Sequence, residues 1–172
     1  GKHIIPYCHN NGKKICAYEY KGYWKDVGTL HSYWEANMEL IDIIPEFNLY
    51  EEYWKIYTKC DTIEPQYIAP GAHVERCIIG ESSEIHGEVI NSVIGPNVYI
   101  GEGSVIRDSI IMKDTCIGKN VTMDKSIVAE NCRIEDGVTL GVGESAPNKL
   151  NASIYSFDLV TVGDDSVIPE NV

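Results

Sequence analysis

Residues 94–140 read IGPNVYIGEGSVIRDSIIMKDTCIGKNVTMDKSIVAENCRIEDGVTL, and this stretch decides the fold. Branched or apolar residues recur in it at steps of 6, 6, 5, 6, 6, 5, 6 and 6, namely Ile94, Ile100, Ile106, Ile111, Ile117, Met123, Val128, Ile134 and Leu140. Three steps therefore make a coil of 17 residues. A second small or β-branched residue follows most of them by four positions, at Val98, Ser104, Ile110, Thr115, Val121, Ile127, Cys132 and Val138. This period fits neither an α-helix nor a β-sandwich, and it indicates a solenoid of stacked coils.

The period of six predicts a left-handed parallel β-helix. Each coil has three short strands, and each strand pairs with its equivalents one coil above and below at about 4.8 Å. Charged residues fall between the apolar positions and are expected to face water: Glu81, Glu102, Arg107, Lys113, Asp114, Lys119, Asp124, Lys125 and Glu130. Glycine follows the leading apolar residue at four places, where we expect corners with positive φ: Gly80, Gly95, Gly101 and Gly118. The first coil is less regular, and we expect a shortened corner near Gly87 to Ser92.

Two segments follow from this pattern. Residues 59–172 form the β-helix domain, with an insertion loop over about 141–158, resumption of the repeat at Val162 and Ile168, and an expected truncation at Val172. Residues 1–58 lack the six-residue period and hold all three tryptophans, so we expect them to be a remnant of a separate domain plus a linker. The chain as a whole is expected to be a piece of a longer protein.

The N-terminal segment is predicted to contain a strand, a loop and a helix. Lys14 to Lys21 alternates in the manner of a strand, and residues 22–29 form the loop. Thr29 is placed as the N-cap of a helix that runs from Leu30 to about Ile43, before Pro45. Free N–H groups and the dipole at such a helix start favour phosphate or a metal–phosphate complex. The expected fold class is therefore mainly β, with the remnant of an α/β domain in front.

Composition excludes several classes of function. The formal net charge of −12 argues against nucleic acid and anionic membrane as partners, because both need clustered cations. The sequence shows no signal-like leader and no run of eighteen apolar residues, which makes the cytoplasm the expected compartment. The six cysteines are scattered singly, as is typical of reduced thiols: Cys8, Cys16, Cys60, Cys77, Cys116 and Cys132.

The run GYWKDVGTLHSYWEANMEL, residues 22–40, resembles the end of the catalytic domain of bacterial glucose-1-phosphate adenylyltransferase, or ADP-glucose pyrophosphorylase. The likeness continues through residues 1–6, through the segment around Trp54 and through the repeats, so it covers essentially the whole chain. It implies a parent enzyme that forms ADP-glucose and pyrophosphate from ATP and glucose 1-phosphate, in bacterial glycogen synthesis. It also implies that groups essential for turnover precede this chain, so the chain alone is expected to be inactive.

The resemblance assigns roles in the first segment. From the residues alone, Asp26 is a turn residue that caps local N–H groups. The family pattern instead makes Asp26 one of two carboxylates that hold Mg²⁺, the second lying in an earlier segment. Trp24, Gly28 and Thr29 are placed near the substrate, although a tryptophan between strand and helix is more often a core residue, and we expect that of Trp24.

The resemblance gives the β-helix a role in assembly and allosteric regulation, in a homo-oligomer that is expected to be a tetramer. Phosphorylated effectors need cationic groups, and Arg107 and Lys125 are the candidates. A regulatory paralogue without activity is the alternative. A hexapeptide-repeat acyltransferase with His86 as base is a weaker one, because an outward, solvent-exposed histidine is the commoner situation. A zinc anhydrase would need three histidines on adjacent coils, and the repeats offer only His73 and His86.

Overall fold

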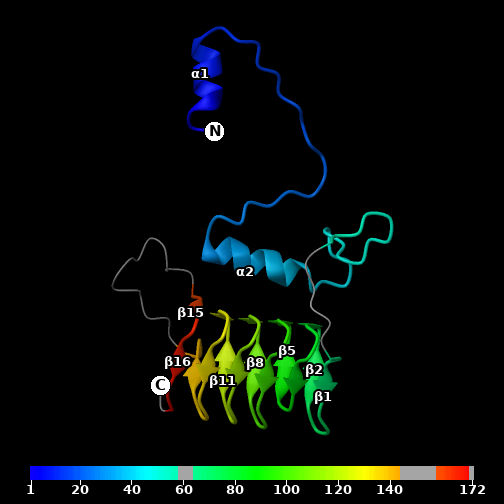
Figure 1. The fold of residues 1–172 in the computed structure, drawn as a ribbon, viewed down its shortest axis with the longest axis vertical. Helices are drawn as coiled ribbons and strands as arrows, with labels where there is room; N and C mark the ends of the chain where they lie inside the picture. The colour runs from blue at the N-terminus through cyan, green and yellow to red at the C-terminus, as the bar shows by residue number, and fades with distance from the viewer. Residues whose placement is uncertain (58–63, 144–157, 171–172) are drawn as a thin grey trace.

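A computed structural model describes residues 1–57, 64–143 and 158–170. It is mainly β, with three parallel sheets that form the faces of a β-helix (Figure 1). The first face stacks six strands: β1 (Tyr67–Ile68), β4 (Glu84–Ile85), β7 (Tyr99–Ile100), β10 (Cys116–Ile117), β13 (Arg133–Ile134) and β16 (Val167–Ile168). The second stacks five: β2 (His73–Glu75), β5 (Glu88–Ile90), β8 (Val105–Arg107), β11 (Thr122–Asp124) and β14 (Thr139–Leu140). The third also stacks five: β3 (Ile78–Ile79), β6 (Val93–Ile94), β9 (Ile110–Ile111), β12 (Ser126–Val128) and β15 (Val160–Val162).

The register confirms the 17-residue coil. Cys116 lies opposite Tyr99 on one side and Arg133 on the other, each 17 positions away. Every residue predicted to point inward between Ile94 and Leu140 is buried, the apolar ones and Ser104 and Thr115 alike. Most of the apolar ones form one cluster along the axis of the β-helix. Ile110 and Ile127 are buried outside this cluster, so their predicted inward direction is wrong: their strand neighbours Ile111 and Val128 belong to the cluster, and successive side chains of a strand point to opposite faces.

The shortened corner lies at the front of the predicted range. Ile85 and Val89 are four residues apart and both fully buried, whereas the equivalent inward step one coil later, from Ile100 to Ile106, has six. Strand β5 consequently pairs with β2 at an offset of 15 residues, Val89 lying opposite Val74. Only His86 and Gly87 separate β4 from β5, whereas four residues separate the equivalent strands of the neighbouring coils, 69–72 between β1 and β2 and 101–104 between β7 and β8. This corner is therefore two residues shorter.

The expected positive φ at Gly80, Gly95, Gly101 and Gly118 is wrong. Positive φ occurs instead at residues such as Asn97, Asp114 and Asn131, whose short polar side chains tolerate the left-handed region. The glycines are needed for a different reason: they allow the backbones of neighbouring coils to approach closely. A Cβ on Gly101 would clash with the backbone of Gly118, and a Cβ on Gly118 would clash with Asp136.

After Leu140 the repeat resumes as predicted. Strand β15 pairs with β12 and β16 with β13, each at an offset of 34 residues, which is one 17-residue coil plus the length that the insertion adds. Val162 is buried and Ile168 is half-buried. Most of the predicted insertion loop, residues 144–157, lies outside the described residues, as do Val172 and the predicted boundary between residues 58 and 59.

The first segment contains two short helices, α1 (Ile4–Asn10) and α2 (Leu30–Glu39). The strand predicted for Lys14 to Lys21 is absent, because these exposed residues have no partner strand in the described ranges to satisfy their backbone groups. Thr29 is the N-cap of α2 as predicted. The helix ends at Glu39 instead of near Ile43, since the chain tightens into i→i−3 hydrogen bonds at Leu40, Ile41 and Asp42.

Helix α2 lies along one corner of the β-helix (Figure 1). Four residues with positive φ form this corner, which we call the α2 corner: Arg76, Asn91, Asp108 and Lys125. Trp34 Nε1 donates to the carbonyl oxygen of Asp108 at 2.6 Å, and Lys125 Nζ lies 5.6 Å from the centroid of the Trp34 ring. Arg76 pairs with Asp42 at 3.3 Å. These contacts join the first segment to three coils of the β-helix.

Candidate functional site

The loop before α2 presents its side chains alternately to the helix and to solvent. Tyr23 and Lys25 are half-buried, whereas Trp24 and Asp26 are exposed. Such alternation is typical of an extended backbone, in which successive side chains point to opposite sides. Trp24 and Asp26 therefore share the outward side of this loop. The expectation that Trp24 is a core residue is wrong, because its exposed fraction is 75% and the described residues place no further layer over the loop.

One carboxylate on α2 holds the inward side of the loop. Glu39 accepts a hydrogen bond from Lys25 Nζ at 2.5 Å and another from the Tyr23 hydroxyl at 3.2 Å. Glu35, one turn earlier, lies 3.4 Å from Lys25 Nζ. The hydrogen bond between Lys25 and Glu39 lowers the pKa of the Glu39 carboxyl group and raises the pKa of the Lys25 ammonium group. The loop is thus attached to the helix by charge-assisted contacts.

The start of α2 is a capping box. The backbone N–H of Ser32 donates to Thr29 Oγ1 at 3.1 Å, and the backbone N–H of Thr29 donates to Ser32 Oγ at 3.0 Å. Thr29 therefore has a local structural role, whatever its distance from a substrate. Gly28 is exposed and lies next to the carboxylate of Asp26.

Asp26 is available to a ligand. Its carboxylate is exposed and makes no hydrogen bond or ion pair within the described part of the chain. Mg²⁺ commonly takes one or two carboxylates and completes its shell with phosphate oxygens and water, so Asp26 fits as one such ligand. The described residues hold no cluster of three or more His, Cys, Asp or Glu that could bind a metal by itself. The metal role of Asp26 stays a prediction.

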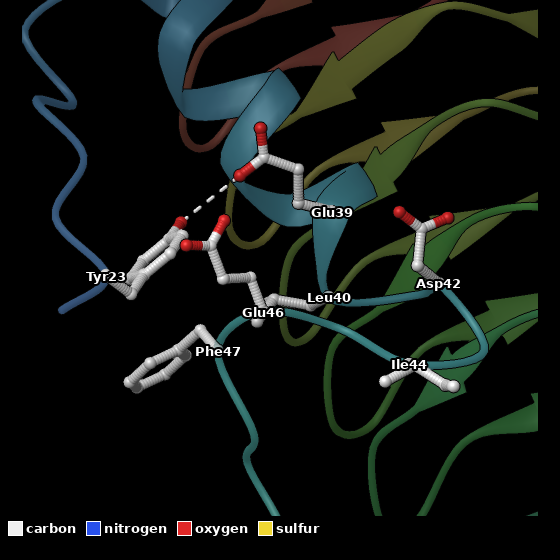
Figure 2. A pocket seen from close by; sticks show the side chains of 7 residues that line it. All are labelled: Tyr23, Glu39, Leu40, Asp42, Ile44, Glu46 and Phe47. Carbon is white, nitrogen blue, oxygen red and sulfur yellow. Dashed lines mark hydrogen bonds between the residues drawn. The ribbon is translucent and has the colours of Figure 1, made fainter. Parts of the chain in front are cut away.

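A cavity of about 270 Å³ lies on the inner side of the loop, between α2 and the turn that follows it (Figure 2). Three carboxylates line it, from Glu39, Asp42 and Glu46, together with the Tyr23 ring, which stacks on Phe47 at 5.4 Å. Two of these carboxylates are already paired with cations, Glu39 with Lys25 and Asp42 with Arg76, and no cation lines the cavity itself, so it offers a phosphate group no charged partner.

The two regulatory candidates lie on neighbouring coils, where the Lys125 N–H donates to the Arg107 carbonyl at 3.2 Å. Both side chains are engaged within the chain. Arg107 pairs with Glu88 at 2.6 Å, and Lys125 lies over Trp34. An anionic effector would have to displace Glu88 from Arg107. Their regulatory role stays a prediction.

His86 is less exposed than expected. It is half-buried between Tyr67 and Tyr99, with ring centroids at 6.1 and 5.3 Å, and its Nε2 lies 3.5 Å from a Glu84 oxygen. The tyrosines flank the ring on both sides. This packing favours a structural role over that of a general base.

The sequence did not predict the contacts of α2 with the loop before it or with the β-helix. Glu39 follows Glu35 by four residues on α2, a spacing that places both carboxylates on one side of the helix. Together with the cation Lys25 in the preceding loop, this spacing was the available signal for an ion pair between loop and helix. The hydrogen bond from Trp34 to Asp108 joins residues 74 positions apart, and no local pattern announces it. Five cysteines are free thiols in the described ranges, and Cys60 lies outside them.

Comparison with known proteins gives two family matches. Residues 62–152 match the GlmU-like C-terminal hexapeptide family, a left-handed β-helix, and residues 1–43 match the nucleotidyl transferase family. Among curated proteins, the chain is 67% identical over its full length to a glucose-1-phosphate adenylyltransferase of Lachnospira eligens and covers 41% of that protein. It is 51% identical to the enzyme of the same name from Thermosipho melanesiensis, over 100% of this chain and 42% of that one. The Acetivibrio thermocellus protein is 43% identical over 99% of this chain and 40% of its own length.

None of the helices in the described ranges is long and apolar enough to cross a bilayer. The chain spans about two fifths of the length of the curated relatives that it matches.

Proposed function

The chain belongs to the GlmU-like C-terminal hexapeptide family, and on that premise we propose that it is the C-terminal part of a glucose-1-phosphate adenylyltransferase. The parent protein joins the AMP portion of ATP to glucose 1-phosphate and releases pyrophosphate, in bacterial glycogen synthesis. The observation that carries the proposal is identity of 67% along the whole chain, first segment and β-helix together, with a protein of that name. An isolated hexapeptide match would leave the chemistry open, because many activities share this fold.

In this reaction a phosphate oxygen of glucose 1-phosphate attacks the α-phosphorus of ATP, and the bond to the β-phosphate breaks. Mg²⁺, when bound, screens the charge of the two approaching anions and of the leaving pyrophosphate. Asp26 supplies one carboxylate to that ion from the outward side of the loop. Trp24 presents an apolar surface on the same side, suited to the face of a sugar.

The β-helix has the role of scaffold in this proposal. On the family resemblance, we propose that it serves the assembly of a homo-oligomer, a tetramer, and that the parent works in the cytoplasm. Its contacts with α2 join this scaffold to the first segment. Allosteric effectors of anionic character would act near Arg107 and Lys125, which lie side by side on the second face and the α2 corner.

A regulatory paralogue without activity is the second candidate. The buried positions of the β-helix serve either role equally. Asp26 favours the enzyme, because an exposed carboxylate without a partner in the described ranges has no structural task to preserve it.

Pyrophosphate release by the full-length parent tests the proposal. We expect release that requires ATP, glucose 1-phosphate and Mg²⁺ together, with ADP-glucose as the second product. Omission of each component in turn is the control. A folded full-length parent that releases no pyrophosphate under these conditions would instead support the paralogue. The 172-residue chain alone is expected to show no turnover.

A further inference from the structure

We propose that Glu39 is a positioning residue that fixes the side on which the loop presents Asp26. The inference rests on the proposed function, since it concerns the carboxylate that serves the adenylyl transfer. Glu39 makes no hydrogen bond or ion pair with Asp26. It acts through Tyr23 and Lys25, which it binds at 3.2 and 2.5 Å.

The backbone of the loop has no regular hydrogen-bond pattern of its own. Residues 22–28 form no helix and no strand, so no backbone ladder fixes their orientation. The half-buried side chains of Tyr23 and Lys25 are what turn this stretch toward α2, and Glu39 accepts hydrogen bonds from both. In an extended stretch, holding residues 23 and 25 from one side forces residues 24 and 26 to the other.

The anchor itself is held in place. Glu39 is the last residue of α2, and this helix is fixed to the α2 corner by Trp34 and by the pair of Asp42 with Arg76. Lys25 keeps only 19% of its side chain exposed, which limits screening of its contact with Glu39. A continuous series of contacts therefore runs from the β-helix to the residue next to Asp26.

Glu35 supplies a matched control. It lies on the same helix one turn earlier, has a similar exposed fraction, 43% against 46%, and also faces Lys25. Its distance to Lys25 is longer, 3.4 Å, and Tyr23 does not donate to it. Replacing either glutamate by glutamine removes the same charge. Lys25 and Tyr23 use different oxygens of Glu39, and a glutamine retains only one acceptor oxygen, so Glu39→Gln also weakens the contact that joins both loop residues to the helix.

The experiment compares Glu39→Gln and Glu35→Gln with the wild-type full-length parent. The first readout is hydrogen–deuterium exchange in the peptide that covers residues 22–27, which does not depend on activity. The second is the Mg²⁺ concentration for half-maximal rate, set against kcat at saturating Mg²⁺. Loss of a group that orients a metal ligand costs about tenfold in metal affinity. We expect Glu39→Gln to raise both exchange and half-saturating Mg²⁺ by about that factor, while Glu35→Gln stays within about twofold of wild type.

Equal exchange in Glu39→Gln and wild type, or equal changes in the two variants, would overturn the positioning role. So would faster exchange with unchanged half-saturating Mg²⁺, because the loop would then move without moving Asp26. A wild-type parent without turnover would overturn the proposed function, and the exchange readout would still decide whether Glu39 holds the loop. The thermal midpoint of each variant verifies that it is folded.

Discussion

Buried serines tie one coil of the β-helix to the next. Ser92, Ser109 and Ser126 are 17 residues apart and fully buried at the α2 corner. The N–H of Ser109 donates to Ser92 Oγ, and the N–H of Ser126 donates to Ser109 Oγ, each at 3.1 Å. Each hydroxyl in turn donates to the carbonyl two residues before it. A hydroxyl is therefore needed here to satisfy buried backbone groups.

Replacement of Ser109 by alanine tests this ladder. The change leaves the Ser126 N–H buried without its acceptor, and an unsatisfied buried donor costs about 1–3 kcal/mol. We expect the free energy of unfolding in urea to fall by that amount. Glu102→Ala, at an exposed turn, should change it by less than about 0.5 kcal/mol. Equal effects of the two substitutions would contradict the role of the hydroxyl.

The thiol of Cys77 gives a second prediction at the scale of residues. Burial raises its pKa, and its Sγ donates to the carbonyls of Glu75 and Val89. The reactive thiolate is therefore scarce near neutral pH and grows only as the pH rises. In alkylation followed by mass spectrometry at pH 7.5, we expect Cys77 to react several-fold more slowly than the exposed Cys16. Reaction of both at one rate would show that the Cys77 environment is more open than the contacts indicate.

At the scale of elements, the β-helix could be predicted because its determinants are local and repeat. The inward positions recur in every coil, so the period can be recognised even where one coil departs from it. The corners were predicted less well. Positive φ was assigned to the glycines after Ile79 and Ile94, while the structure places it at residues such as Asn97. Both turn chemistry and close packing select for small or polar residues, and the sequence does not distinguish them.

The first segment was predicted less accurately for a physical reason. A strand exists only through its partners, and Lys14 to Lys21 has none in the described ranges. A helix start has local signals, so Thr29 was placed correctly as the N-cap. The helix end has weaker ones, and α2 ends at Glu39, six residues before Pro45.

The cap of α2 can be tested directly. Thr29→Ala removes the acceptor of the Ser32 N–H, and loss of an N-cap costs about 1 kcal/mol. We expect faster hydrogen exchange in the first turn of α2, whereas Thr29→Ser retains the hydroxyl and should match wild type. Unchanged exchange in the alanine variant would show that the contacts of Trp34 with the β-helix hold this turn without the cap.

At the scale of the molecule, none of the contacts between the first segment and the β-helix was predicted from the sequence. Trp34 meets Asp108 and Lys125 because the β-helix brings its α2 corner under the helix, and only the assembled fold places them together. The candidate site was predictable as a motif, residues 22–29, through its resemblance to a known family. Its geometry was not, since Trp24 is exposed and Glu39 accepts hydrogen bonds from two residues of the loop.

In the function that we propose, Asp26 serves adenylyl transfer in the parent and the β-helix supports it. We would measure kcat/KM for ADP-glucose formation by the full-length parent and by Asp26→Asn, at saturating Mg²⁺. A metal ligand is worth several kcal/mol at the transition state, so we expect a fall of at least about 100-fold with an unchanged thermal midpoint. An Asp26→Asn variant that keeps the wild-type kcat/KM would contradict it.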